Sequence, residues 1–163
     1  MLARNHVVFG IGTWLVVGVP AGLDSSGLAN SIALASIGSL LPDVDHPKSW
    51  LGRRLPGISH AVALTTGHRG MTHSALLAIV SVFVLAAISL QHWAAPLLVG
   101  FMTHIFCDWC TKGGVPLLWP LKTRFRSPVA FSTGGIFEYA VTGMVLVAVG
   151  WLYGQQLAES LGV

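Results

Sequence analysis

Five long apolar segments alternate with polar connections along this chain. They cover residues 7–23, 27–41, 74–91, 94–110 and 135–157. At 1.5 Å per residue, four of them approach or exceed the roughly 30 Å of a bilayer's hydrocarbon core, whereas 27–41 reaches only about 22 Å. We therefore expect that segment to be tilted, enclosed by its neighbours or extended into the residues that follow. The pattern predicts an all-α, polytopic membrane bundle of about five transmembrane helices, forming a single integral membrane domain over residues 1–163.

Two features refine this prediction. Segment 27–41 places small residues four apart, at Gly27, Ser31, Ala35 and Ser39, a spacing typical of helices that pack closely in lipid. The first segment, preceded by Arg4, could also be a signal peptide. Because four further apolar segments follow, a first transmembrane helix is the simpler interpretation.

The connections between the segments differ greatly in length. Residues 24–26 and 92–93 are tight turns, whereas 42–73 and 111–134 are long and contain Pro, Gly, Trp and basic residues. Mixed polar and apolar composition and aromatic residues are typical of chain lying at the membrane surface. We therefore predict short interfacial helices in both long loops.

The overall composition supports the membrane class. Hydrophobic residues make up 53% of the chain and charged residues 9%, and the mean hydropathy is +0.72. Soluble domains carry about 25% charged residues, and disordered chains are poor in apolar residues. The pI near 9.2 comes from an excess of three charges without a basic run, which argues against nucleic acid as a partner.

The charges are distributed unequally between the two sides of a five-helix topology. The side with the N-terminus and both long loops holds every basic residue, and the other side holds only Asp24 and Glu159. Since basic loops stay in the cytoplasm, we predict a bacterial-type inner (plasma) membrane protein with a cytoplasmic N-terminus and a periplasmic C-terminus. The basic residues are Arg4, Lys48, Arg53, Arg54, Arg69, Lys112, Lys122, Arg124 and Arg126.

The same topology gathers histidines and acids at the cytoplasmic end. His60 and His92 fall outside this set. Each member has a separate structural explanation, such as helix packing, capping or an ion pair between Arg69 and Glu138. Together they indicate a metal site, because polar groups at membrane depth are costly and usually functional. The set comprises His6, Asp43, Asp45, His46, His68, His73, His104, Asp108 and Glu138.

The spacing of these residues fits metal binding. His104 and Asp108 are four apart, so they share one helix face, and imidazole and carboxylate are ligands of zinc. Asp43, Asp45 and His46 are close enough to supply two ligands, or a ligand and its hydrogen-bonding partner. The donors exceed one tetrahedral shell, so we predict two or three divalent ions, zinc foremost, with manganese or magnesium as alternatives.

Three motifs of the chain resemble those of a known family. LLPDVDHP (40–47), GHRGMTHS (67–74) and HIFCDWCTKGGVPLLWP (104–120), preceded by His6, resemble the YdjM-type membrane-bound metal-dependent hydrolases. That family is remotely similar to zinc-dependent phospholipase C and P1-type nucleases. The resemblance implies a helical phosphoesterase. A later His-x-x-x-Glu of the soluble enzymes has no match, because Gly134 precedes Glu138 by four residues. The implied ligands are His6, Asp43 or Asp45, His68, His73, and His104 with Asp108.

These observations favour a metal-dependent hydrolase of phosphoric esters, acting on a membrane lipid or lipid-linked phosphate at the cytoplasmic leaflet. Metal lowers the pKa of bound water, and Asp45 or Asp108 could accept its proton. Arg69 could bind phosphate bidentately, while Arg124, Arg126 and Glu138 complete the expected substrate site.

Two alternatives belong to other classes. A metal- or proton-coupled transporter would need polar residues across the bilayer, but 75–90 offers only Ser81 and Ser89, and the middle of 135–157 only Thr142. A non-catalytic membrane protein could instead use the metal for stability alone.

Overall fold

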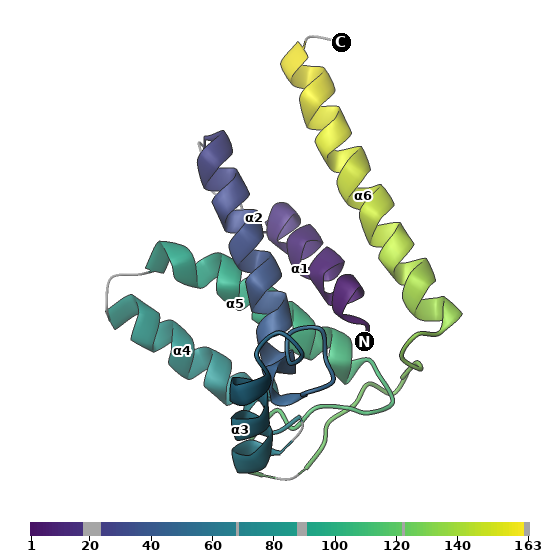
Figure 1. The fold of residues 1–163 in the computed structure, drawn as a ribbon. Coiled ribbons are helices and arrows are strands. Elements are labelled where there is room, and N and C mark those ends of the chain that lie inside the picture. Colours follow the sequence, from purple (N-terminus) through teal and green to yellow (C-terminus); the bar gives the residue numbers. More distant parts are fainter. Residues whose placement is uncertain (18–23, 68, 88–90, 122, 162–163) are drawn as a thin grey trace.

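The computed structural model describes residues 1–17, 24–67, 69–87, 91–121 and 123–161 (Figure 1). Within these ranges the structure is all-helical, as predicted. Each apolar segment forms a helix, although residues 18–23 and 88–90 of the expected helices lie outside the described residues. The helices are α1 (Ala3–Val17), α2 (Ser25–Leu40), α3 (Pro56–Thr66), α4 (Ala75–Ala87), α5 (Gln91–Trp109) and α6 (Ile136–Leu161), with the 3₁₀ turns η1 (Leu41–Asp45) and η2 (Met71–His73).

Local chemistry determines both ends of α2. At its start, the Asp24 carboxylate accepts a hydrogen bond from the Gly27 N–H at 2.7 Å, which is the usual N-cap arrangement. That N–H and the Ser26 hydroxyl lower the pKa of Asp24. At its end, Pro42 lacks an N–H, and the chain tightens into η1. The second apolar segment is thus extended into the following motif, which is one of the three possibilities that its short length left open.

Close backbone contacts position α2 between α1 and α5. Ser31, Ala35 and Ser39 of the predicted small-residue row are buried. A Cβ added at Gly38 would lie 2.1 Å from a carbonyl oxygen of α5, and one added at Gly100 would lie 2.0 Å from a carbonyl oxygen of α2. The two helices approach this closely because both contact positions are glycine. The predicted close packing is confirmed.

The remaining helices surround this centre. In Figure 1, α4 and α5 form an antiparallel pair that lies across the direction of α2 and α6. Helix α1 packs against α2, α5 and α6 and buries His6 and Trp14, so the first apolar segment is an integral part of the bundle. Helix α6 leaves most of its apolar side chains exposed.

Two described segments are long and apolar enough to cross a membrane. They are Ser25–Asp45, with a mean hydropathy of 1.2, and Ile136–Tyr153, with 1.6. Helices α1 and α4 contain 15 and 13 residues, fewer than the about 20 that a straight span requires. The five-span topology therefore stays a prediction.

The two long loops have different structures. Helix α3 lies in the first long loop, residues 42–73, where a short helix was expected. The second expected helix is wrong for the described residues of 111–134. There the chain forms two isolated β-bridges, Thr111 with Phe131 and Val115 with Phe125. Glycines 113 and 114 and prolines 116, 120 and 128 disfavour a helix, because glycine costs backbone entropy and proline removes hydrogen-bond donors.

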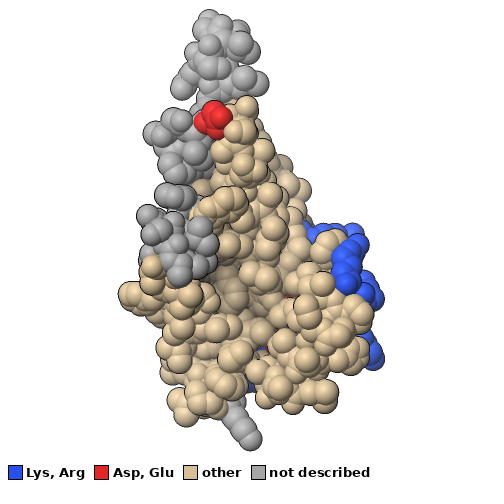
Figure 2. Space-filling model, turned by 60° about the vertical axis from the view of Figure 1, so that its left-hand side comes forward, with Lys and Arg blue, Asp and Glu red and all other residues tan. Residues whose placement is uncertain are grey.

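The N-terminus, α3 and the second long loop lie at one end of the molecule, and the C-terminus lies at the other (Figure 1). Figure 2 shows Lys and Arg side chains gathered towards the same end, with an acidic side chain near the opposite end and a largely uncharged face between them. This arrangement agrees with the charge asymmetry predicted for the chain.

Candidate metal centre

The predicted ligands converge from four elements that are distant in sequence. Helix α1 supplies His6, η1 supplies Asp43, η2 supplies His73, and α5 supplies His104 and Asp108. All are buried except Asp43, whose side chain is 18% exposed. Two overlapping groups of donor atoms result, each with its atoms within 4.8 Å of one another: His6, His104 and Asp108, and Asp43, His73 and His104.

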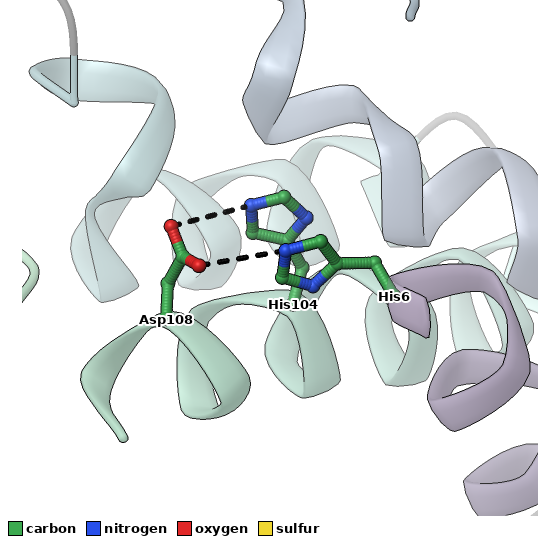
Figure 3. Close-up of side chains that lie close together, drawn as sticks. All are labelled: His6, His104 and Asp108. Carbon is green, nitrogen blue, oxygen red and sulfur yellow. Dashed lines mark ion pairs between the residues drawn. The ribbon is translucent and has the colours of Figure 1, made fainter. Parts of the chain in front are cut away.

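The first group joins α1 to α5. Figure 3 shows the His6 and His104 rings lying face to face, with Asp108 beside them. The ring centroids are 3.7 Å apart and the planes differ by 12°. His6 Nε2 lies 3.4 Å from Asp108 Oδ1, and His104 Nε2 lies 3.9 Å from Asp108 Oδ2. His104 and Asp108 therefore share one helix face, as their spacing predicted.

The second group orients two histidines toward each other. His104 Nδ1 lies 2.7 Å from the Ser39 carbonyl oxygen, and His73 Nδ1 lies 3.2 Å from Asp45 Oδ2. Both oxygens are acceptors, so each Nδ1 donates a proton to its partner. The two Nε2 atoms lie 3.3 Å apart in a buried site, and in neutral rings each of them carries a lone pair. Two facing lone pairs repel unless a cation or a proton lies between them.

These distances fit the coordination shell of a metal ion. Ligands about 2.0–2.1 Å from a tetrahedral Zn²⁺ lie about 3.3–3.4 Å from one another. The Nε2 atoms of His73 and His104 are 3.3 Å apart, and His73 Nε2 is 3.7 Å from Asp108 Oδ2. The residues present therefore fit a divalent ion. His104 has a single Nε2 available, so the two groups cannot each bind a separate ion through it.

Asp45 contacts the ligands rather than joining either group. Its Oδ2 accepts hydrogen bonds from the Thr72 hydroxyl and from the Gly70 N–H, and it faces Nδ1 of His73. A carboxylate that orients a ligating histidine is common in metal sites. The sequence left Asp45 open as a ligand, as the hydrogen-bonding partner of a ligand or as a proton acceptor, and the geometry favours the hydrogen-bonding partner over the ligand.

The sequence interpretation missed the contributions of Ser39 and Thr72. Ser39 is the penultimate residue of α2, where helix carbonyls lack an intrahelical partner, so its oxygen is available to His104. Every residue has a main-chain carbonyl, so the identity of residue 39 does not indicate that its carbonyl oxygen accepts a hydrogen bond from His104. Thr72 directly precedes His73 within the GHRGMTHS motif. Its place in that motif is the feature of the sequence that could have indicated its contact with the site.

Arg69 connects the metal centre to the second long loop. Its Nη2 lies 2.6 Å from Asp108 Oδ2, and its Nη1 donates to the Gly114 carbonyl at 3.2 Å. The backbone of Arg69 has a φ of 53°, which few non-glycine residues adopt. The guanidinium therefore lies at the site, as predicted, and pairs with Asp108 rather than with Glu138. The amino group of Met1 also contacts Asp108, at 2.7 Å.

Glu138 has a structural role that differs from the expected substrate contact. Its Oε1 accepts from the Leu2 N–H and the Asn5 side chain, and its Oε2 accepts from the Gly134 N–H. The residue is fully buried. These bonds attach the N-terminal segment to the start of α6, and they occupy both carboxylate oxygens.

The remaining predicted residues lie nearby or outside the described chain. His46 follows η1 and belongs to neither group among the described residues. His68 is one of the residues that the structure does not describe. Arg124 and Arg126 are exposed on the second loop. His60 is exposed on α3, with its Nδ1 2.7 Å from the Pro56 carbonyl oxygen, so it lies apart from the centre as predicted.

Comparison with known proteins gives the family. The chain matches the YdjM inner membrane protein family over residues 1–161. The chain belongs to this family. It is 46% identical over 98 residues to inner membrane protein YdjM of Escherichia coli strain K12 and to its namesake in Shigella flexneri, a match that covers 55% of this chain and 49% of each relative.

Another relative matches this chain over nearly the full length of both proteins. The uncharacterized protein YvsG of Bacillus subtilis strain 168 is 31% identical over 155 residues, covering 94% of this chain and 95% of YvsG. The match to the YdjM relatives, by contrast, spans about half of their length. No solved structure matches the chain. The resemblance that the motifs indicated is confirmed, and the chain is a membrane protein of the YdjM family.

In this YdjM family member, a basic pocket adjoins the metal centre. The pocket has a volume of about 520 Å³, and both Asp43 and Arg69 line it. Its wall includes three further cationic side chains, Arg4, Lys48 and Arg53. Several cations around one opening attract anions. The sequence interpretation placed Arg124 and Arg126 in the substrate site, whereas neither lines this pocket.

Proposed function

We propose that this protein is a divalent-metal-dependent hydrolase that cleaves a phosphoric ester of a membrane lipid or lipid-linked phosphate at the cytoplasmic leaflet of a bacterial inner membrane. The observation that carries the proposal is the pair of Nε2 atoms of His73 and His104, which lie 3.3 Å apart in a buried site beside Asp108, each with a lone pair when its ring is neutral. A buried arrangement of this kind is stable when a cation accepts both lone pairs.

The metal ligands would be His6, His73, His104 and Asp108, with Asp43 at the edge of the shell. Zinc suits three imidazoles and a carboxylate, and manganese or magnesium are the alternatives from the sequence. The predicted two or three ions would need ligands beyond the shared His104. When bound, a divalent ion lowers the pKa of its water and polarises the phosphoryl oxygen.

Residues of the chain would accept the proton of the water, bind the phosphoryl group and orient the histidines. Asp43 is the one partly exposed carboxylate of the two groups and faces the basic pocket, which suits it to accept the proton of the attacking water. The water oxygen would bond to phosphorus as the ester P–O bond breaks and the leaving oxygen takes a proton. Arg69, held by Asp108 and Gly114, would orient a phosphoryl oxygen. Asp45 would keep His73 in the required tautomer.

The membrane placement follows from the same groups. The metal centre, the basic pocket and the basic loops share one end of the molecule, and we infer that this end faces the cytoplasm. The apolar segments would form five spans, of which α4 and α5 are strongly inclined. A lipid could then present its head group to the pocket without leaving the bilayer.

Phosphate release by purified protein tests this function. Protein loaded with Zn²⁺, Mn²⁺ or Mg²⁺ should hydrolyse a soluble aryl phosphate ester or an anionic phospholipid, and chelation should abolish the reaction. Asp43→Asn should lower kcat by about 10²-fold or more, whereas His60→Ala should match the wild type. Bound metal without hydrolysis, accompanied by ion flux in proteoliposomes, would favour the transporter instead.

A further inference from the structure

An apolar cavity lies beside the metal centre, between α4, α5 and η1. Its volume is about 260 Å³. Its wall is almost entirely hydrocarbon, including Leu41, Val44, Leu77, Leu97, Leu98 and Phe101. The two hydroxyls in the wall are already hydrogen-bonded, Ser81 to the Leu77 carbonyl and Thr72 to Asp45. A buried water needs two to four polar partners, so this cavity suits an apolar occupant.

The cavity and the metal centre are continuous along two elements. On α5, Ala94, Leu97 and Phe101 line the cavity, and His104 follows Phe101 by one turn on the same face. From Ala94 to His104 the helix advances about 15 Å. On η1, Val44 lines the cavity while the adjacent Asp43 lines the basic pocket.

We propose that this cavity holds one acyl chain of an anionic glycerophospholipid whose phosphate lies at the metal centre, an inference that rests on the proposed function and specifies its substrate class. Asp43 and Arg69 line the cationic pocket, whereas Val44 and Thr72, which adjoin Asp43 and His73 in the sequence, line the apolar cavity. An amphiphile with a phosphate head group and a hydrocarbon chain matches this polarity. Because the acyl chain moves from bilayer hydrocarbon into the cavity, the fit of the chain to the cavity wall would select substrates by chain length.

Photo-cross-linking tests the position of the chain independently of catalysis. The probe is phosphatidylglycerol with a diazirine near the end of one acyl chain, presented to the full-length protein in lipid nanodiscs. Cross-links should concentrate on peptides that contain residues 77–78 and 94–101. Labelling spread evenly over exposed apolar side chains, such as Met144 and Val147 on α6, would overturn the proposal.

Filling the cavity supplies a second test. Ala94 is buried and lines the cavity, whereas its neighbour Ala95 is exposed. Ala94→Leu should lower cross-linking in the cavity about tenfold and should lower the ratio of long-chain to short-chain phospholipid turnover by a similar factor. Ala95→Leu should change neither quantity. Equal effects of the two substitutions would contradict the assignment, and Ala78→Leu repeats the test if Ala94→Leu does not fold.

The two proposals fail in different ways. Hydrolysis of a soluble phosphate ester without cross-linking in the cavity would retain the hydrolase and reject the acyl-chain site. Cross-linking in the cavity without any metal-dependent hydrolysis would retain a lipid-binding site and reject the hydrolase.

Discussion

At the scale of single residues, the hydrogen bonds at Nδ1 of two histidines determine what their Nε2 atoms can do. The Ser39 carbonyl orients His104, and the Asp45 carboxylate orients His73. Both rings therefore direct Nε2 into the same small volume. The carboxylate partner also makes His73 a better ligand, because it raises the basicity of the imidazole.

Substitution of Asp45 tests this orienting role. Asp45→Asn keeps the size of the side chain but removes the charge beside His73. We expect the affinity for Zn²⁺ to fall about 10- to 100-fold, as is usual when such a partner of a ligand is lost, while the helical content is retained. Competition with a chromophoric chelator measures the affinity.

A matched control for Asp45→Asn is Asp24→Asn, at the opposite end of α2. Asparagine caps helices as well as aspartate does, and Asp24 is exposed and remote from the ligands. Its affinity for Zn²⁺ should equal that of the wild type. An unchanged affinity in Asp45→Asn would contradict the orienting role.

Sequence reasoning reached part of this residue-scale detail. The spacing of His104 and Asp108 predicts a shared helix face, and that face is present. The choice between ligand and partner for Asp45 depends on Thr72 and His73 folding back onto η1, a tertiary contact that spacing does not encode. The same holds for Glu138, whose burial against Leu2 and Asn5 depends on how α1 meets α6.

At the scale of elements, two glycines allow the approach of α2 and α5 that brings the Ser39 carbonyl to His104. Gly100→Ala would place a methyl group against the backbone carbonyl of Ala35. We expect the free energy of unfolding to fall by about 1–3 kcal/mol, because the backbone must shift. Denaturant titration in detergent micelles measures it.

Gly143→Ala is the matched control for this contact. A Cβ at Gly143 would meet no atom of the described residues within 4 Å, and alanine favours helix over glycine by about 1 kcal/mol. This variant should be as stable as the wild type or more so. Equal destabilisation by both substitutions would contradict the close contact.

The attachment of α1 to α6 by Glu138 gives another prediction for the elements. Glu138→Ala leaves the buried Asn5 side chain and the half-buried Leu2 N–H without an acceptor, so the free energy of unfolding should fall by about 1–3 kcal/mol. Thermal unfolding followed by intrinsic fluorescence measures the loss.

Tyr139→Phe is the control for Glu138→Ala. It removes only the exposed hydrogen bond from Arg4 to the Tyr139 hydroxyl, and it should change the free energy of unfolding by less than about 0.5 kcal/mol. If Glu138→Ala also changed the free energy of unfolding by less than about 0.5 kcal/mol, the hydrogen bonds of Glu138 would not stabilise the fold.

The elements themselves were largely predictable. Long apolar runs predict helices, and each of the five runs is helical over most of its described residues. The helix predicted for the second long loop is absent from its described residues. The aromatic and basic residues of that loop are typical of an interfacial helix, but its glycines and prolines disfavour one. The close approach of α2 and α5 was not predicted from the sequence, since it depends on contacts of Gly38 and Gly100 with residues distant in the chain.

At the scale of the whole molecule, charge and chemistry are concentrated at one end. The basic pocket, the candidate metal centre and the N-terminus lie together, and α6 extends away from them with exposed apolar side chains. An odd number of spans places the two termini on opposite sides of the membrane, and an even number places them on the same side.

Reporter fusions distinguish these topologies. With five spans, alkaline phosphatase fused after residue 163 should be active in the periplasm, whereas green fluorescent protein at the same position should not fluoresce. An N-terminal fusion of green fluorescent protein should fluoresce in the cytoplasm and serves as the control. A fluorescent C-terminal fusion would contradict five spans.

The metal content of the purified protein tests the central claim most directly. Elemental analysis of the wild type, His73→Ala, His104→Ala and the control His60→Ala should be done on the monodisperse fraction of each. We predict at least one equivalent of bound divalent metal in the wild type and in His60→Ala, and less than about a tenth of that in the two ligand variants. A wild type without metal after loading, or ligand variants that retain full occupancy, would contradict the metal centre.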